Sequence, residues 1–209
     1  ERIRTYPLNE PVDRPLWHRL FHLQNIPAEN GRATVEAVVQ ARINGRRHVI
    51  RSDNFNGAGH EPFTVQVDEE ALPGSERCLW TDLHCHSAYT DTQVEFGPPL
   101  PALLAMAKAI GLGAVAVTDH SFDLDDQADD YLAADTELGK WRALHEEARA
   151  LNAANEIKII CGEEVSVGNR RRRNVHLLIL NDPAFYPGSG DSGENWPQIR
   201  PQEQVAQVL

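Results

Sequence analysis

The chain has 209 residues, 41% of them hydrophobic, which is enough apolar material for one large domain or for a small domain and a larger one. Its 31 acidic and 20 basic residues give a formal net charge of -11. Because phosphates would be repelled, this charge argues against nucleic acid or an anionic membrane as the main partner, whereas it suits a site that concentrates cations. Three cysteines, at positions 78, 85 and 161, fit no disulfide framework, which favours a reducing cytoplasm. No apolar run approaches the roughly 18 residues that a membrane helix needs.

Residues 1–77 are predicted to form an N-terminal extension and a small β-rich, sandwich-like domain. A β-branched run at 34–43 leads into Asn44-Gly45, a strong hairpin-turn signal, and apolar residues return at 48–50 and 63–67. A turn that contains Pro and Gly then places the domain boundary near residue 77.

Two histidines of the extension, His18 and His22, stand four residues apart and would share one face of a helix. That spacing could bind zinc, but no further ligand lies nearby. An amphipathic anchor is therefore the preferred interpretation of this segment.

Residues 78–209 alternate between apolar strands and helices. Strands are predicted to begin near residues 79, 114, 157 and 174, and helices are predicted at 101–110 and 135–155. Strands that are almost continuously apolar and separated by helices indicate a parallel sheet that is covered on its outside. A segment rich in Pro, Gly and Ser follows at 183–201, and an amphipathic helix begins at 202.

The first of these strands carries the densest group of metal-binding side chains. Asp82, His84 and His86 alternate along it, and side chains two apart on a strand share a face. Two imidazoles at that spacing can converge on one cation, and Asp91 in the following loop adds a hard oxygen donor.

Similar side chains are predicted at the carboxyl ends of the later strands: Asp119 and His120, then Glu164, then His176. In parallel α/β barrels this end of the strands carries the chemistry. A histidine inside an apolar strand costs desolvation unless something satisfies it, and a single case is usually a core histidine bonded to a backbone carbonyl. Four strand ends in register favour a metal centre instead.

These residues closely resemble the motifs of the polymerase and histidinol phosphatase (PHP) family of metal-dependent hydrolases. The first motif, HxHxxxxD, is His84, His86 and Asp91; the second, TDH, is Thr118-Asp119-His120; the third, GxE, ends at Glu164 rather than Glu163. His176, in an apolar strand, stands where the family has its next histidine. The resemblance covers about residues 79 to 180.

This resemblance implies an α/β fold, a distorted seven-stranded (TIM-like) barrel that holds two or three divalent ions, often zinc, manganese or iron. His84 and His86 would bind the first metal, Glu164 would bridge it to a second that His176 also holds, and Asp91 and His120 would bind a third. Asp82 and Asp119 fit better as groups that orient the imidazoles. The family's later motifs, another histidine and a final Asp-x-His, have no counterpart after His176. We therefore expect the barrel to be incomplete in this chain and the remaining ligands to lie beyond residue 209.

The implied chemistry is hydrolysis of a small-molecule ester, in which cations lower the pKa of a bound water and give a hydroxide nucleophile. Phosphate esters are the first expectation. Carbamate or carboxyl esters are the second, because the β-rich start and the sequence LWTDLHCHS loosely resemble a PHP branch with carbamate hydrolases. The general acid is not identified.

Two alternatives of other kinds stay open. One is a non-catalytic, metal-binding regulatory domain, against which the full ligand set argues. The other is the amidohydrolase superfamily, whose pattern lacks TDH and GEE and uses a strand-end lysine that this chain does not have.

An arginine run, residues 170–173, precedes the strand of His176. Arg172 and Arg173 could clamp a substrate phosphate, since guanidinium groups bind phosphate oxygens in pairs. A solvated hairpin tip is the more common explanation of such a run.

Overall fold

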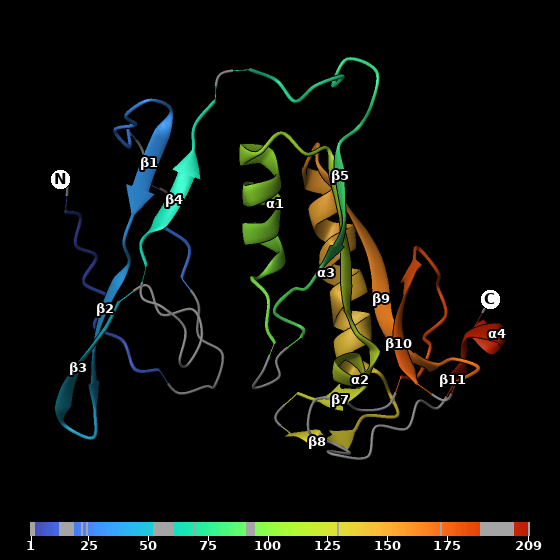
Figure 1. Cartoon of the computed structure of the whole chain (residues 1–209). Helices are drawn as coiled ribbons and strands as arrows, with labels where there is room; N and C mark the ends of the chain where they lie inside the picture. The colour runs from blue at the N-terminus through green and yellow to red at the C-terminus, as the bar shows by residue number, and fades with distance from the viewer. Residues whose placement is uncertain are drawn as a thin grey trace. The chain divides into compact units, whose positions relative to one another are not determined.

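The computed structural model describes residues 3–12, 19–21, 23, 25–51, 61–68, 70–90, 95–128, 130–171, 173–188 and 203–208 (Figure 1). The chain divides into two compact units, one of Phe21–Pro73 and one of Glu1–Leu20 with Gly74–Leu209. None of the helices in the described residues combines the length and apolarity that crossing a membrane requires.

In its described residues the smaller unit has two separate strand pairs. Strand β1 (Arg32–Val35) pairs antiparallel with β4 (Phe63–Gln66), and β2 (Val38–Ile43) pairs antiparallel with β3 (Arg46–Arg51). The second pair turns at Asn44-Gly45, where both residues have the positive φ that this hairpin turn requires. Among the described residues of this unit only Ala33 is buried, so a sandwich-like domain with its boundary near residue 77 stays a prediction.

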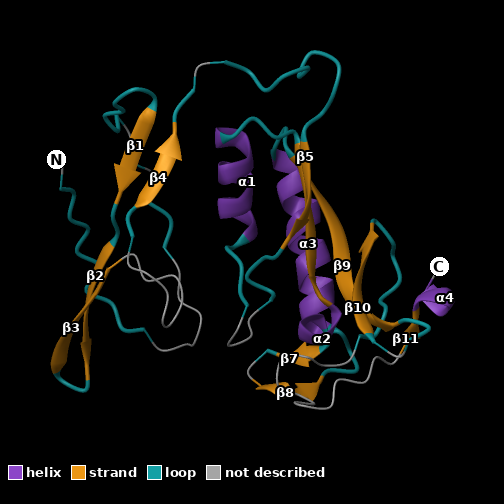
Figure 2. Cartoon of the chain, viewed as in Figure 1, coloured by secondary structure: helices purple, strands orange, loops and turns teal. Residues whose placement is uncertain are grey.

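The larger unit is a mixed α/β structure around one curled sheet (Figure 2). Its strand order is β10-β9-β6-β5, with the short strand β11 also paired to β9. The bounds are Thr81–Cys85 for β5, Ala114–His120 for β6, Lys158–Gly168 for β9, Asn174–Leu180 for β10 and Glu203–Gln204 for β11. Strands β5, β6 and β9 are mutually parallel, as predicted. The sheet is compatible with part of an α/β barrel, whose seven strands stay a prediction.

Two helices cover one face of this sheet and form the core with it. Helix α1 (Leu100–Ala109) ends before Gly111, which has a φ of 81°. Helix α3 (Gly139–Ala154) begins at Gly139, whose N–H donates to Asp135 Oδ2 at 2.8 Å. Val115 and Val117 of β6 point into this core, together with Leu144 of α3. Because side chains alternate along a strand, His120 of β6 lies on the opposite face, where the candidate site is.

The prediction of an all-parallel sheet is wrong for its last strand, because β10 pairs antiparallel with β9. Only residues 169–173 connect the two strands, and a parallel crossover needs about a dozen residues or more. Strand β9, predicted to begin near residue 157 and to have Glu164 at its carboxyl end, continues past Glu164 to Gly168, and its Val165 and Val167 are buried. Glu164 therefore lies within a strand and His176 near the start of one, rather than both at carboxyl ends.

The acidic segment after β6 is ordered rather than a simple loop. It forms α2 (Ser121–Leu124), β7 (Asp126–Gln127) and β8 (Asp130–Ala134), with Phe122 and Leu124 buried. The predicted C-terminal helix appears as the short α4 (Val205–Val208).

Candidate metal centre

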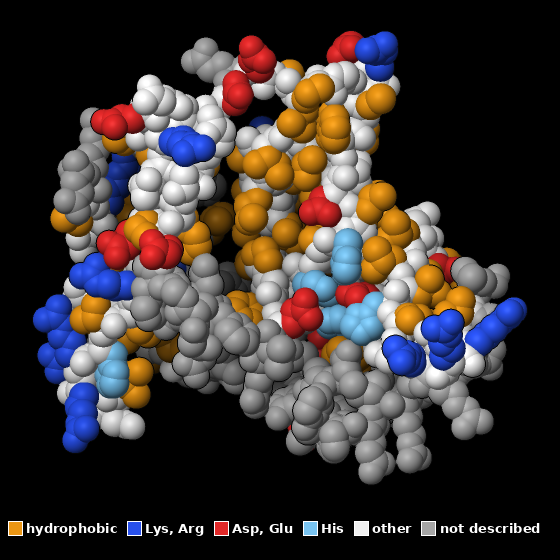
Figure 3. All heavy atoms as spheres, in the orientation of Figure 1, with side chains coloured by type: hydrophobic (Ala, Val, Ile, Leu, Met, Phe, Trp, Pro, Cys, Tyr) orange, Lys and Arg blue, Asp and Glu red, His pale blue; other side chains and the backbone are white. Residues whose placement is uncertain are grey.

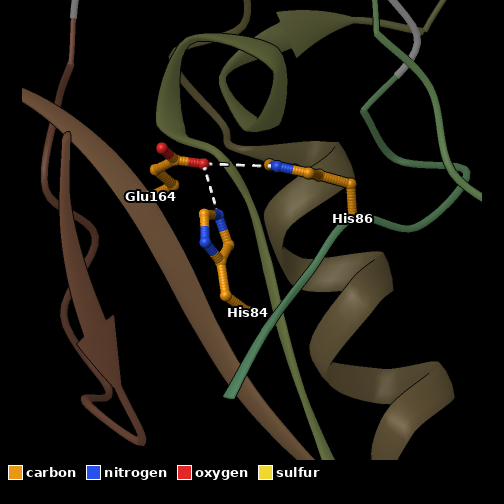
Figure 4. Close-up of side chains that lie close together, drawn as sticks. All are labelled: His84, His86 and Glu164. Atoms are coloured by element: carbon orange, nitrogen blue, oxygen red, sulfur yellow. Dashed lines mark hydrogen bonds and ion pairs between the residues drawn. The ribbon is translucent and has the colours of Figure 1, made fainter. Parts of the chain in front are cut away.

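Several histidines meet at Glu164, and Figure 4 shows two of them, His84 and His86, pointing toward its carboxylate. Its Oε2 lies 2.9 Å from His84 Nε2 and 3.2 Å from His86 Nε2, and its Oε1 contacts His176 Nδ1. The Glu164 side chain is only 5% exposed. Burial alone would raise its pKa, but hydrogen bonds from His176, His86 and His84 hold the pKa of this carboxyl well below its ordinary value. Glu164 is thus a carboxylate that remains ionised among imidazoles.

The two histidines of the first motif reach Glu164 although their strand is irregular. The pairing of β5 with β6 shifts register between Asp82 and Cys85, so the strict alternation expected along this segment is broken. The rings of His84 and His86 still lie close together, with centroids 5.4 Å apart. Burial lowers the pKa of His86, but its bond to Glu164 and the nearby carboxylate charges raise it overall.

His120 faces two different carboxylates. Its Nδ1 lies 3.6 Å from Glu164 Oε2, and its Nε2 lies 3.0 Å from Glu95 Oε2. The ring is stacked on Phe122 at 4.5 Å and on His86 at 4.6 Å. Among the described residues no hydrogen-bond partner satisfies Nδ1, although the side chain is only 5% exposed. A buried nitrogen in this state needs another partner, and a cation would supply one.

Glu95 is a site residue that sequence reasoning missed. Besides its contact with His120, its Oε1 lies 3.5 Å from His86 Nε2. It stands four residues after Asp91, outside the quoted motifs, so its only sequence signal was a carboxylate in the loop after the HxH strand.

The ligand-type atoms are arranged as a cation would require. Zinc binds imidazole nitrogen and carboxylate oxygen at about 2.0–2.2 Å, so two tetrahedral ligand atoms lie about 3.3 Å apart. The separations of 2.9–3.6 Å around Glu164 Oε2 are close to that value. Three groups bring such atoms within 4.8 Å of one another: His84–His86–Glu164, His86–Glu95–His120 and His120–Glu164–His176. The side chains therefore fit divalent metals, and Figure 3 shows histidine and acidic groups gathered on this surface.

Asp119 and Asp82, predicted to orient imidazoles, have different environments. Asp119 is fully buried and accepts hydrogen bonds from Ser87 N–H (2.6 Å), Ser87 Oγ (2.6 Å) and Thr90 Oγ1 (2.9 Å). Burial raises the pKa of Asp119 despite these bonds. Asp82 is exposed and accepts from the backbone N–H of His84 at 3.1 Å, so it supports the strand backbone rather than a ring.

Thr90 connects Asp119 to His86. Its hydroxyl donates to Asp119, and its Oγ1 lies 3.3 Å from His86 Nδ1 and accepts from the His120 backbone N–H at 3.3 Å. Because the hydroxyl proton is committed to Asp119, His86 must donate from Nδ1, so Nε2, which faces Glu164, is the nitrogen that would lose its proton to bind a cation. Thr90 therefore fixes the tautomer that a metal ligand needs.

Thr90→Val is expected to weaken metal binding by about 10- to 100-fold, since it removes a partner that orients a ligand. Competition with a chromophoric chelator measures this affinity, and Thr90→Ser should restore it. Thr118→Val is the matched control, because the Thr118 hydroxyl is also buried but faces the backbone carbonyl of Cys85. Equal affinities for Thr90→Val and the control would contradict the assignment.

The remaining residues that the sequence analysis singled out either lie away from the histidine cluster or fall outside the described residues. Asp91, Arg172, His18 and His22 belong to segments that are not described. Arg173 is exposed, between β9 and β10. Glu163 points away from the histidines and accepts from Ser121 Oγ (3.0 Å) and the Tyr186 N–H (3.1 Å). Burial raises the pKa of Glu163 to about 7.

Residues 82–185 match the family model of the PHP domain. This part of the chain belongs to the PHP domain family, whose members are in general metal-dependent hydrolases. The match spans every motif from Asp82 to His176 and includes the Glu95 segment. No curated protein matches the chain.

Proposed function

We propose that this chain is a metal-dependent hydrolase of ester bonds, with phosphate esters as its first substrate class. The observation that carries the proposal is the convergence of His84, His86 and His176 on the Glu164 carboxylate within a PHP domain. Buried carboxylates are rarely surrounded by imidazoles unless a charge is to be held there.

The proposed cofactors are two or three divalent ions of zinc, manganese or iron. His84 and His86 would hold one ion, Glu164 would bridge it to another held by His176, and Asp91 and His120 would hold a third. Imidazole and carboxylate donors suit these metals. When bound, such ions lower the pKa of a water molecule toward neutrality and neutralise the charge that develops on the ester.

The protein's own contribution is to hold the ligands in place. Glu164 stays ionised, Thr90 and Asp119 fix the ring of His86, and Phe122 covers one face of the His120 ring. Arg173, with Arg172, is proposed to bind the substrate phosphate, because guanidinium groups pair with phosphate oxygens. The net charge of -11 supports a small-molecule substrate rather than nucleic acid, and the three unpaired cysteines support a cytoplasmic location.

The test is a hydrolysis screen of the protein after chelation and after reconstitution with Zn²⁺ or Mn²⁺. Aryl phosphate mono- and diesters, an aryl acetate and an aryl carbamate are offered in parallel. We expect metal-dependent turnover of a phosphate ester, lost on chelation. His84→Ala should lower both metal binding and turnover by more than about 100-fold, because loss of a ligand exceeds the cost of losing its supporting partner.

The other outcomes separate the alternatives. Faster metal-dependent hydrolysis of the carbamate or acetate would replace the phosphate ester as substrate class. Stoichiometric metal without any turnover would favour a regulatory metal-binding domain. Full activity in His84→Ala would contradict the site itself.

A further inference from the structure

Glu95 belongs to a segment that is anchored against the histidine loop. The N–H of Gly97 donates to the carbonyl of Ser87 at 3.1 Å, and the N–H of Ala88 donates to the carbonyl of Pro98 at 3.0 Å. A Cβ at position 97 would lie 2.1 Å from the carbonyl oxygen of His86, so only glycine permits this approach. The backbone two residues after Glu95 is therefore held directly beside His86.

The Glu95 carboxylate spans two imidazoles from different strand ends. Oε1 lies 3.5 Å from His86 Nε2, and Oε2 lies 3.0 Å from His120 Nε2. The two rings are stacked at 4.6 Å, and each turns its Nε2 toward the Glu95 carboxylate. The three ligand atoms lie within 4.8 Å of one another.

Glu95 is a second carboxylate beside the histidines, and its group shares His86 and His120 with the groups around Glu164. His120 turns Nδ1 toward Glu164 and Nε2 toward Glu95, so one imidazole lies between two carboxylates on opposite edges of its ring. His120 Nε2 and the Glu95 carboxylate, whose side chain is half exposed, therefore form a pair of donors that is open on one side.

We propose that Glu95 is a metal ligand that joins His120 at the third ion of the proposed function, while His86 Nε2 serves the ion that it shares with His84. This inference rests on the proposed function, since it assumes that the centre binds divalent metals. Glu95 is then the carboxylate on the solvent side of the cluster, where substrate must approach.

The experiment compares the whole chain with its Glu95→Gln variant in a titration with Mn²⁺, followed by electron paramagnetic resonance of the free ion and by elemental analysis after desalting. Glu95→Gln keeps the shape of a half-exposed side chain, so the fold should be retained, and circular dichroism checks this. Glu76→Gln is the control, because it removes the same charge from an exposed glutamate that pairs with Arg77.

We expect Glu95→Gln to lose one Mn²⁺ equivalent, or to bind it at least about 10-fold more weakly, while the control matches the wild type. Identical stoichiometry and affinity in Glu95→Gln and the wild type would overturn the inference and leave the proposed function standing. Failure of the wild type to bind Mn²⁺ or Zn²⁺ at all would overturn both.

Discussion

Glu164→Gln should abolish stoichiometric metal binding and reduce hydrolysis by more than about 100-fold. The carboxylate contacts His84, His86 and His176 and lies 3.6 Å from a nitrogen of His120, so among the described residues it is the one anion beside all four imidazoles. Glutamine has a similar shape but carries no charge, and its amide would face these nitrogens with donors. Metal content by elemental analysis and turnover of the best substrate measure the effect.

Glu163, the residue before Glu164 in the sequence, provides the control for Glu164→Gln. Glu163 lies on the other face of β9, where Ser121 and Tyr186 donate to it. Because burial raises the pKa of Glu163 to about 7, its neutral form is already accessible and Glu163→Gln should cost little. Glu163→Gln should keep its metal, and loss of metal in both variants, or in this one alone, would contradict the assignment of Glu164.

Asp119→Ala should be the most destabilising single change, at about 3–5 kcal/mol in the free energy of unfolding. The carboxylate is fully buried and accepts from the N–H and hydroxyl of Ser87 and from the hydroxyl of Thr90. Its removal leaves these donors without an acceptor and releases the loop that follows β5. Urea unfolding of the metal-free protein measures the change.

Asp82→Ala tests whether the burial of Asp119 is the reason for the large loss of stability expected in Asp119→Ala. Asp82 is exposed and accepts one bond from the His84 N–H, so its loss should cost less than about 1 kcal/mol. A similar cost for Asp119→Ala and Asp82→Ala would show that the Ser87–Thr90–Asp119 network is not structural.

Local sequence pattern was sufficient for the parts of the fold with clear periodicity. Strand β6 and helix α1 agree with their predictions to within two residues, because apolar runs and the Pro and Gly at the helix ends are local signals. The antiparallel orientation of β10 was not predicted, because an apolar run does not indicate the direction of its strand in the sheet. Only the short connection at 169–173 indicated a hairpin.

The site residues also divide into those that sequence motifs predicted and those whose role depends on the three-dimensional fold. His84, His86, His120, Glu164 and His176 were selected by motif, and the structure brings their side chains together. Asp82 and Asp119 looked equivalent in the sequence, whereas burial separates them, and burial depends on the whole fold. Glu95 could not be selected as a site residue from the sequence. Its position depends on the contact of Gly97 with the His86 backbone, which the spacing of residues along the chain does not indicate.

Metal content per chain is the measurement that tests this account most directly. The protein would be reconstituted with Zn²⁺, Mn²⁺ or Fe²⁺, desalted and analysed by elemental mass spectrometry. The arrangement of His84, His86, His120, His176, Glu164 and Glu95 predicts at least two equivalents of a divalent metal, released by chelation. A chain that retains no metal after reconstitution would contradict the hydrolytic centre and every role proposed for its ligands.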